Sequence, residues 1–379
     1  MTSHAASVPQ PSSRLTVGLV RRGYSPSGGA ERYLKRFAEA LARAGHDPLL
    51  FASPEWPKAE WPHGQVVPVE GDTPIAFADT LRTLTPDFPC DFLFSLERVH
   101  ACDCYRAGDG VHKLWLERRT TYEPKWRSAT RFLNRKHAQI LALEEEMFSK
   151  QTARSIIVNS KMVLQEIVSH YQYPADRIEV VYNGIPSRSF ESRPGIRQKI
   201  REELWIKPDE CLVLFVGSGW DRKGLQFAIH AVDNLPASTK ARLVVAGKGN
   251  RLKTRSSKTI FLGPVTDVLS YLEAADCFIL PTTYDPFSNA CLEALAAGLP
   301  VITTSMNGFS EIIKHQEQGW ILNAPDDIQD IQNAITFWSD IQKNQQLKPS
   351  LIEYAKNFTA ETNLHQTLEA ITRLLKLQS

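Results

Sequence analysis

Short, apolar, β-branched runs alternate with helical segments along the chain, and the alternation restarts once. In the first half the expected strands are TVGLV (16–20), DPLLFA (47–52), DFLFSL (91–96), SIIVNS (155–160) and EVVYNGI (179–185). In the second half they are CLVLFVG (211–217), RLVVAGKG (242–249), TIFLG (259–263), DCFILP (276–281) and LPVITT (299–304). Strands that alternate with helices form parallel sheets. The two arrays therefore predict an α/β protein with two doubly wound, Rossmann-like domains that face each other across a cleft.

A linker separates the two arrays. The segment NGIPSRSFESRPG (183–195) is rich in Pro, Ser and Gly. We expect an N-terminal domain at 14–187 and a C-terminal domain at 188–353, after a disordered tail at 1–13 that lacks the apolar stretch of a signal peptide. Ligands of such sheets bind beyond the carboxyl ends of the strands, so the cleft between the domains is the expected site.

Composition excludes several classes of protein. Of the 379 residues, 23% are charged and 42% are hydrophobic, which is typical of a globular chain. The net charge of +2 predicts no general attraction to nucleic acid. The six cysteines show no metal-binding spacing, so we expect reduced, packed thiols in a cytoplasmic protein. No apolar run approaches the length of a membrane span.

Two glycine-rich loops follow expected strands. In YSPSGGAER (24–32), Gly28 and Gly29 let a ligand approach the backbone at a helix start, although an ordinary tight turn explains them equally well. In GSGWDRKG (217–224), Arg222 and Lys223 stand where a phosphate would be met. The alternative for this second loop is a solvated basic surface.

The stretch YDPFSNACLEALAAGLPV (284–301) places carboxylates on both sides of a helix start near Ser288 or Asn289. Free amides of Ser288, Asn289 and Ala290 would bind a diphosphate. Glu293, about one turn further on, and Asp285, before the helix, would then accept hydrogen bonds from hydroxyls of a ribose and of a sugar. The alternative is that Asp285 caps the helix and that Glu293 is a surface residue.

A further carboxylate lies in RAGDGVHKLW (106–115). Asp109 is flanked by two glycines in a loop that we place after the DFLFSL strand, where a carboxylate can reach a substrate. An ordinary Asp-Gly turn is the alternative. Together the four loops indicate a protein that binds a nucleoside diphosphate with a sugar attached.

The same stretches resemble retaining GT-B glycosyltransferases of the family 4 type. The resemblance rests on VGSGWDRKGLQFAIHAV, VVAGKGN, FLGPVTDVLSYLEAADCFILPTTYDPFSNACLEALAAGLPVITT and GFSEII, and on SGGAERYLKRFAEALARAGHD in the first half. Within the family, AGDGVHKLWLERR and GSGWDRKG resemble the lipopolysaccharide core glucosyltransferases that act on inner-core heptose. The resemblance implies the GT-B architecture, with acceptor binding in the N-terminal domain, nucleotide-sugar binding in the C-terminal domain, and a C-terminal helix (354–379) that crosses back to the N-terminal domain.

The family's site residues can be placed on this sequence. Its paired acids, with seven residues between them, fall on Asp285 and Glu293, although the first is usually Glu and the shorter Asp departs from the pattern. Its phosphate-binding lysine falls on Lys223; its arginine position is Ser218 here, so Arg222 is expected to take that role. The resemblance implies as catalytic Asp109 on the acceptor side, Arg222, Lys223 and Asp285. It implies as nucleotide-sugar-binding Gly28, Gly29, Gly217, Ser218, Arg222, Lys223, Val265, Asp285, Phe287, Ser288, Asn289, Ala290 and Glu293.

The activity expected from the resemblance is retaining transfer of a hexose, most simply glucose, from a UDP-sugar to a lipopolysaccharide core or similar lipid-linked glycan. No Asp-x-Asp triplet occurs, so we expect no metal and no cofactor. Two other classes remain open. One is a GT-B enzyme with another acceptor or reaction, such as a sugar-nucleotide epimerase. The other is a non-catalytic, membrane-associated sugar-binding protein.

The segment 113–137 carries eight Lys or Arg residues against two acids, with aromatic residues between them. Such a stretch can bind an anionic membrane surface or the phosphates of an acceptor. The residues expected to do so are Lys113, Arg118, Arg119, Trp126, Arg127 and Arg131. A solvated helix with aromatic residues in the core is the alternative, and nucleic acid is the least favoured partner. A lipid-linked acceptor places the protein on the cytoplasmic face of the inner membrane.

Overall fold

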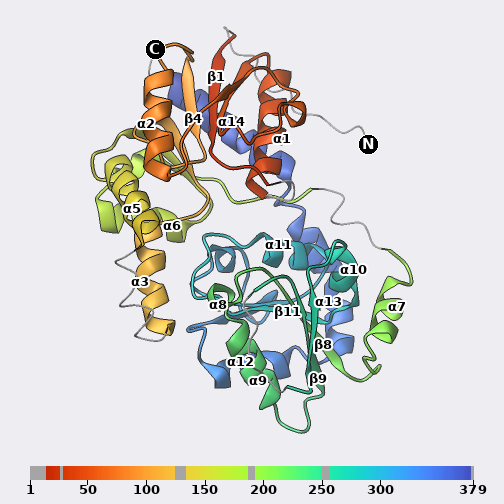
Figure 1. Ribbon diagram of the computed structural model, residues 1–379. Coiled ribbons are helices and arrows are strands. Elements are labelled where there is room, and N and C mark those ends of the chain that lie inside the picture. The colour runs from red at the N-terminus through yellow and green to blue at the C-terminus, as the bar shows by residue number, and fades with distance from the viewer. Residues whose placement is uncertain (1–13, 26–28, 124–133, 187–192, 250–255, 377–379) are drawn as a thin grey trace.

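A computed structural model describes residues 14–25, 29–123, 134–186, 193–249 and 256–376. Figure 1 shows two α/β domains, one above the other, each built around its own sheet. Every strand pair within the two sheets is parallel. The predicted fold class is confirmed.

The N-terminal sheet has seven strands in the order β3-β2-β1-β4-β5-β6-β7. The strands are β1 (Thr16–Arg21), β2 (Asp47–Ala52), β3 (Val66–Pro68), β4 (Phe92–Ser95), β5 (Cys102–Ala107), β6 (Ala153–Val158) and β7 (Ile178–Val180). The helices of this domain are α1 (Gly29–Arg43), α2 (Pro74–Leu84), α3 (His112–Tyr122), α5 (Arg135–Phe148) and α6 (Lys161–Tyr171), with short 3-10 turns η1 (Lys58–Glu60) and η3 (Ala175–Arg177).

The C-terminal sheet has six strands in the order β10-β9-β8-β11-β12-β13. The strands are β8 (Cys211–Val216), β9 (Ala241–Ala246), β10 (Thr259–Gly263), β11 (Cys277–Leu280), β12 (Val301–Thr304) and β13 (Gly319–Leu322). The helices of this domain are α7 (Ile196–Glu203), α8 (Trp220–Lys223), α9 (Leu225–Asp233), α10 (Val268–Ala274), α11 (Asn289–Ala296), α12 (Ile328–Phe337) and α13 (Ile341–Ala355), with the 3-10 turn η5 (Gly308–Ile312). The last helix, α14 (Ala360–Lys376), belongs to the N-terminal domain in space.

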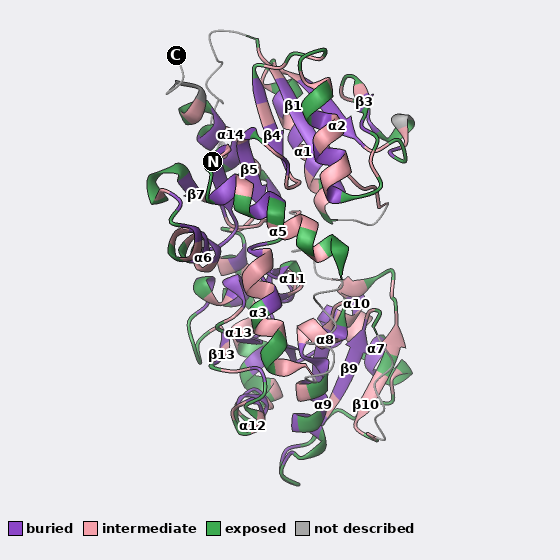
Figure 2. Cartoon of the chain, turned by 60° about the vertical axis from the view of Figure 1, so that its left-hand side comes forward, coloured by how far each residue is buried: buried purple, intermediate pink, exposed green. Residues whose placement is uncertain are grey.

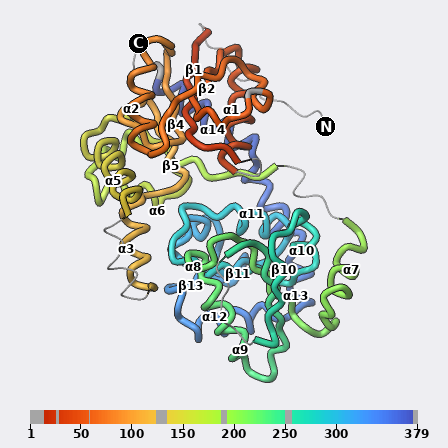
Figure 3. Tube along the Cα trace, in the orientation of Figure 1, coloured from red at the N-terminus to blue at the C-terminus, as the bar shows by residue number. Residues whose placement is uncertain are grey.

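Two segments connect the domains and run beside each other. Residues 182–185 leave the first domain, and Ile185 pairs with Thr359 on the way back. The Nδ2 of Asn363 donates to the carbonyl of Tyr182 at 2.6 Å. Helix α14 then packs on α1 and buries Ile371 in the N-terminal core (Figure 3). Since α13 ends at Ala355 and α14 begins at Ala360, the return crossing lies between them.

The inner strands of both sheets form the buried layer, which Figure 2 shows in purple. They are buried because each doubly wound sheet has helices on both faces, so its strands are continuous apolar runs instead of alternating ones. Strand β8, for example, is CLVLFV, of which only the last residue is partly exposed. All six cysteines are free thiols, and five of them are buried.

Three strands, β3, β5 and β13, were not expected from the sequence. Strand β5 reads CDCYRA, in which Asp103 and Arg106 interrupt the apolar run. As a result Asp109 follows β5, and the expectation that its loop follows the DFLFSL strand is wrong. The correction places Asp109 at the end of β5, which lies between β4 and β6 in the sheet.

Candidate active site

The loop of Asp109 is fixed on both sides of the carboxylate. The carbonyl of Gly108 accepts from Asn159 Nδ2 at 3.1 Å, and that of Gly110 accepts from Arg98 Nη2 at 2.7 Å. Gly110 has a φ of +70°, which favours glycine. Because both neighbouring carbonyls are hydrogen-bonded, the backbone that carries the exposed side chain of Asp109 is held in place.

A buried carboxylate positions the start of helix α3 next to this loop. Glu144 accepts hydrogen bonds from the amides of His112 (2.7 Å) and Lys113 (3.0 Å). The guanidinium of Arg98 lies 2.9 Å from the same carboxylate. An anion at a helix N-terminus is favourable because the first amides lack partners within the helix. Burial and the charge of Arg98 lower the pKa of His112 to about 4, so this imidazole is neutral at pH 7.

Tyr284, in the C-terminal domain, contacts the Asp109 loop directly. Its hydroxyl accepts from the amide of Val111 at 2.9 Å and donates to Glu166 Oε2 at 2.8 Å. A Cβ on Gly110 would lie 2.2 Å from this hydroxyl, so only glycine fits there. Arg118 lies over the Tyr284 ring at 5.0 Å and pairs with Glu166 at 2.8 Å. The Asp109 loop and the C-terminal domain are thus joined through the side chain of Tyr284.

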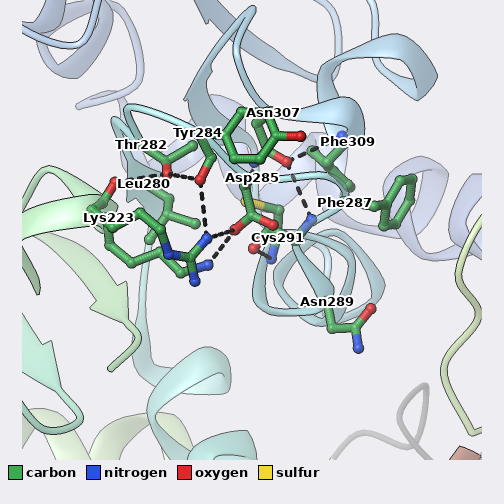
Figure 4. Close-up of polar contacts among 12 residues, drawn as sticks. Lys223, Leu280, Thr282, Tyr284, Asp285, Phe287, Asn289, Cys291, Asn307 and Phe309 are labelled. Carbon is green, nitrogen blue, oxygen red and sulfur yellow. Dashed lines mark hydrogen bonds and ion pairs between the residues drawn. The ribbon is translucent and has the colours of Figure 1, made fainter. Parts of the chain in front are cut away.

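Asp285, the residue after Tyr284, is the carboxylate between two cationic side chains, Lys223 and Arg222 (Figure 4). Asp285 pairs with Lys223 Nζ and lies 3.7 Å from Arg222 Nη1. Arg222 also donates to the carbonyl of Tyr284 at 3.0 Å. The side chain of Asp285 is 8% exposed and that of Arg222 is 36% exposed. Asp285 therefore holds both cations in place, and Arg222 presents its charge toward solvent.

Helix α8 supplies these cations because glycines flank it. Gly219 and Gly224 both have a φ of +73°. A Cβ on Gly224 would lie 1.9 Å from the carbonyl oxygen of Pro281. The spacing G-x-x-x-x-G in GSGWDRKG therefore makes a four-residue helix whose last two residues are Arg222 and Lys223.

Helix α11 begins where the sequence indicates, with Ser288 as its N-cap accepting from the amide of Cys291. The amide of Ser288 itself donates to Asn307 Oδ1 at 3.1 Å and is buried, so the expectation of a free amide there is wrong. Within the described residues, the amides of Asn289 and Ala290 have no hydrogen-bond acceptor. Figure 4 shows the side chain of Asn289 apart from the network around Asp285. Two amides, not three, are open at this helix start.

The other expected donor-side residues occupy mixed environments. Glu293 is half-buried, and burial raises the pKa of its carboxyl against the opposing charge of Arg32. The ring of Phe287 packs against Tyr182 and Phe309 in the core. Further residues expected at the site are placed as follows: Gly217 follows β8 and is half-buried, Ser218 is exposed, Val265 is half-buried after β10, and Gly29 opens α1. Gly28 lies outside the described residues.

Helix α3 bears the described part of the basic segment, and it lies alongside the C-terminal domain in Figure 1. Tyr122 contacts the ring of Phe227 of that domain, with centroids 6.0 Å apart. Arg118 is paired with Glu166 and Arg119 with Glu123. Because Arg118 is ion-paired within the protein and 29% of its side chain is exposed, its contact with a membrane or an acceptor stays a prediction. Lys113 is half-buried.

Trp126, Arg127 and Arg131 lie outside the described residues. Among the residues that are described, no helix is long and apolar enough to cross a membrane. The same residues contain no group of three His, Cys, Asp or Glu side chains that could hold a metal ion. Metal-independent chemistry stays a prediction.

Two cavities lie between the domains. One, of about 250 Å³, has Gly29, Asp109, Phe287 and Asn289 in its wall. The other, of about 480 Å³, lies between α3 and α8, with Arg222 in its wall. Three further residues face the first cavity without any local sign of it in the sequence: Arg106, Asn159 and Asn183. Arg106 and Asn159 lie at the ends of β5 and β6, and recognising β5 would have drawn attention to its Arg106.

Known families match both domains. The family model described as Glycosyltransferase Family 4 matches residues 27–188, and the one described as Glycosyl transferases group 1 matches residues 210–339. The crystal structure of WaaG, a glycosyltransferase involved in lipopolysaccharide biosynthesis, has a TM-score of 0.73 at 22% identity, over 93% of this chain and 98% of that one. The fold and the matched regions define a GT-B glycosyltransferase.

Proteins with similar sequences are also glycosyltransferases. The lipopolysaccharide glucosyltransferase WaaG of Escherichia coli K12 is 26% identical over 324 residues, 80% of this chain and 83% of WaaG. The uncharacterized glycosyltransferase MJ1607 of Methanocaldococcus jannaschii is 35% identical over 191 residues, so the match spans 46% of this chain and about half (49%) of that relative. Anabaena HepE in complex with UDP-glucose has a TM-score of 0.66 at 16% identity, over 95% of this chain and 100% of HepE. The chain belongs to the GT-B glycosyltransferases of the group 1 and family 4 type.

Proposed function

We propose that this glycosyltransferase moves glucose from UDP-glucose to a lipopolysaccharide core or similar lipid-linked glycan, with retention of configuration and without a metal ion. The observation that carries the proposal is the direct junction between the two half-sites: Tyr284 contacts the Asp109 loop, and the next residue, Asp285, holds Lys223 and Arg222. An acceptor-side carboxylate and two donor-side cations thus lie on a single connected network.

The donor half suits a nucleoside diphosphate. Arg222, Lys223 and the open amides of Asn289 and Ala290 are the groups that bind phosphate oxygens in proteins. HepE, which has this fold, was crystallised with UDP-glucose. The half-buried carboxylate of Glu293 is an acceptor for ribose hydroxyls, and ionising it costs less once hydroxyl groups donate to it.

The chemical step follows from where charge develops. When the bond between the sugar and the β-phosphate breaks, negative charge grows on the phosphate. Lys223 and Arg222 stabilise that charge in the transition state more than in the ground state, because they are already oriented by Asp285. Retention requires the acceptor hydroxyl to attack from the face that the phosphate leaves. Its proton passes to the departing phosphate or to Asp109.

The acceptor proposal rests on the likeness to WaaG, a lipopolysaccharide glucosyltransferase that is similar over 80% of this chain. A lipid-linked acceptor implies work at the cytoplasmic face of the inner membrane. The basic residues of 124–133 would provide the contact with anionic lipid, since Arg118 and Arg119 are ion-paired within the protein.

The test is a transfer assay with purified protein, UDP-[14C]glucose and lipopolysaccharide truncated at the inner-core heptose, with EDTA present. We expect label in the lipopolysaccharide and an α-linkage by NMR. UDP-galactose and UDP-N-acetylglucosamine serve as alternative donors, and a neutral oligosaccharide as alternative acceptor. Transfer that needs a divalent metal, inverts the anomeric centre, or proceeds only from another nucleotide sugar contradicts the proposal.

A further inference from the structure

Arg106 is a buried guanidinium without a carboxylate partner. It projects from β5 with 7% of its surface exposed. Nη2 donates to Asn183 Oδ1 at 3.1 Å, whereas Nη1 has no hydrogen-bond partner. Within the described residues no acidic side chain lies within ion-pairing distance of it. A buried, uncompensated charge is costly, so a protein keeps one where a ligand supplies the anion.

The surroundings of Arg106 point to a ligand and not to a structural role. Its guanidinium lies over the ring of Tyr33 at 4.3 Å, which fixes the plane of the fork. It faces the 250 Å³ cavity that also contains Asp109. Among the described residues, the wall of this cavity has three arginines and one carboxylate. Arg21 differs from Arg106, since Glu31 and Glu97 neutralise it at 3.0 and 2.6 Å.

A second orphaned group lies in the same wall. Asn159 is 2% exposed; its Nδ2 donates to the Gly108 carbonyl, and its Oδ1 has no partner. An unused acceptor on Asn159 and a missing anion on Arg106 together describe a ligand that both donates a hydroxyl hydrogen and carries negative charge. A sugar with an acidic substituent meets both requirements, while a neutral sugar leaves Arg106 uncompensated.

We propose that Arg106 binds a carboxylate or phosphate on the acceptor glycan, so that the enzyme selects an acidic sugar acceptor whose attacking hydroxyl then lies beside Asp109. The proposal rests on the proposed function in taking the Asp109 cavity as the acceptor site. The β-phosphate of the donor is the other possible source of the anion, because Asn289 of α11 also lines the cavity.

Calorimetric titration of the full chain distinguishes an anion on the acceptor sugar from the β-phosphate of the donor, and it does not require glucose transfer. The probes are methyl glucoside, glucuronate, glucose 6-phosphate and UDP. We expect the two acidic sugars to bind wild type about 10–100-fold more tightly than methyl glucoside, as charge-assisted hydrogen bonds require. Arg106→Gln should remove that preference and leave the affinity for UDP within twofold of wild type.

The matched control is Arg154→Gln. Arg154 is an exposed arginine of the neighbouring strand β6, paired with Asp103 at 3.1 Å, and its loss changes the net charge equally. It should keep the preference for acidic sugars. Arg106→Lys, which keeps the charge, provides a readout if Arg106→Gln does not fold, and should retain part of the preference.

Three results overturn the inference. They are equal affinity of wild type for acidic and neutral sugars, a preference that survives in Arg106→Gln, and a loss of UDP affinity in Arg106→Gln that matches the loss for the sugars. The last result would assign Arg106 to the donor phosphate. A protein that binds acidic sugars through Arg106 but transfers no glucose would contradict the proposed function alone.

Discussion

Tyr284→Phe tests the contact that joins the two half-sites. The substitution keeps the buried ring and removes only the hydroxyl, which accepts from Val111 N at 2.9 Å and donates to Glu166 Oε2 at 2.8 Å. Leaving a buried amide unpaired costs about 1–3 kcal/mol, and losing a hydrogen bond to a carboxylate about 1.5–3 kcal/mol. Arg118 still compensates Glu166 at 2.8 Å, so the lower part of the second range applies.

The combined loss is therefore about 2.5–4.5 kcal/mol. If the arrangement of the Asp109 loop against Asp285 is needed in the transition state, most of this loss is expressed in transfer. A loss of that size lowers kcat/KM for the acceptor roughly 70–2000-fold. The affinity for UDP should change little, because the hydroxyl touches neither Lys223 nor Arg222.

The assay is steady-state glucose transfer at varied acceptor concentration, with UDP affinity measured by calorimetry. Tyr173→Phe is the matched control, because it also removes a buried tyrosine hydroxyl, one that donates to the Ala153 carbonyl at 2.7 Å within the N-terminal core. It should lower the melting temperature with transfer nearly unchanged. If Tyr284→Phe loses no more transfer than Tyr173→Phe, the coupling of the half-sites through Tyr284 is refuted.

Three further predictions concern Lys223, Glu293 and the basic residues of 124–133. Lys223→Ala should weaken UDP binding about 10–100-fold by calorimetry, the value of a charge-assisted hydrogen bond, and unchanged affinity would remove Lys223 from the phosphate site. Burial raises the pKa of Glu293, so the folded state keeps this proton to a higher pH than the unfolded state does. The folded state therefore loses stability as pH rises from the unfolded pKa through the folded pKa. Glu293→Gln should raise the melting temperature at pH 7 but not at pH 4 and should weaken UDP binding; an equal shift of the melting temperature at both pH values would contradict the assignment. Arg127→Gln with Arg131→Gln should lower partitioning to anionic vesicles roughly 30-fold, at about 1 kcal/mol for each charge, whereas the exposed pair Arg154→Gln with Lys240→Gln should not; equal partitioning of both double variants would rule out 124–133 as the membrane contact.

Sequence patterns predicted the fold class because buried parallel strands read as continuous apolar runs. They failed at β5, where Asp103 and Arg106 break the run. A strand can carry such residues when neighbours in space contact them: Asp103 accepts from the amide of Leu93 at 2.8 Å, and the guanidinium of Arg106 lies over the ring of Tyr33. Neither neighbour is adjacent in sequence, so no local pattern shows them.

The site was predictable to the extent that it is local. The glycines around α8 and the cap of α11 are determined by backbone geometry within a few residues, and both could be inferred from the sequence. The partners of the side chains could not. The Ser288 amide donates to Asn307, which is 19 residues away in the sequence, and Arg118 is ion-paired with Glu166, which is 48 residues away. These long-range contacts decide which amides and cations stay open to a ligand.

The most direct test of the account is a crystal structure with UDP bound. We expect the diphosphate within hydrogen-bond distance of Lys223 Nζ and of the amides of Asn289 and Ala290, on the side of Asp285 that faces the Asp109 loop. A nucleotide bound outside the cleft, or a diphosphate in the cleft that touches neither Lys223 nor the start of α11, would contradict the central claim.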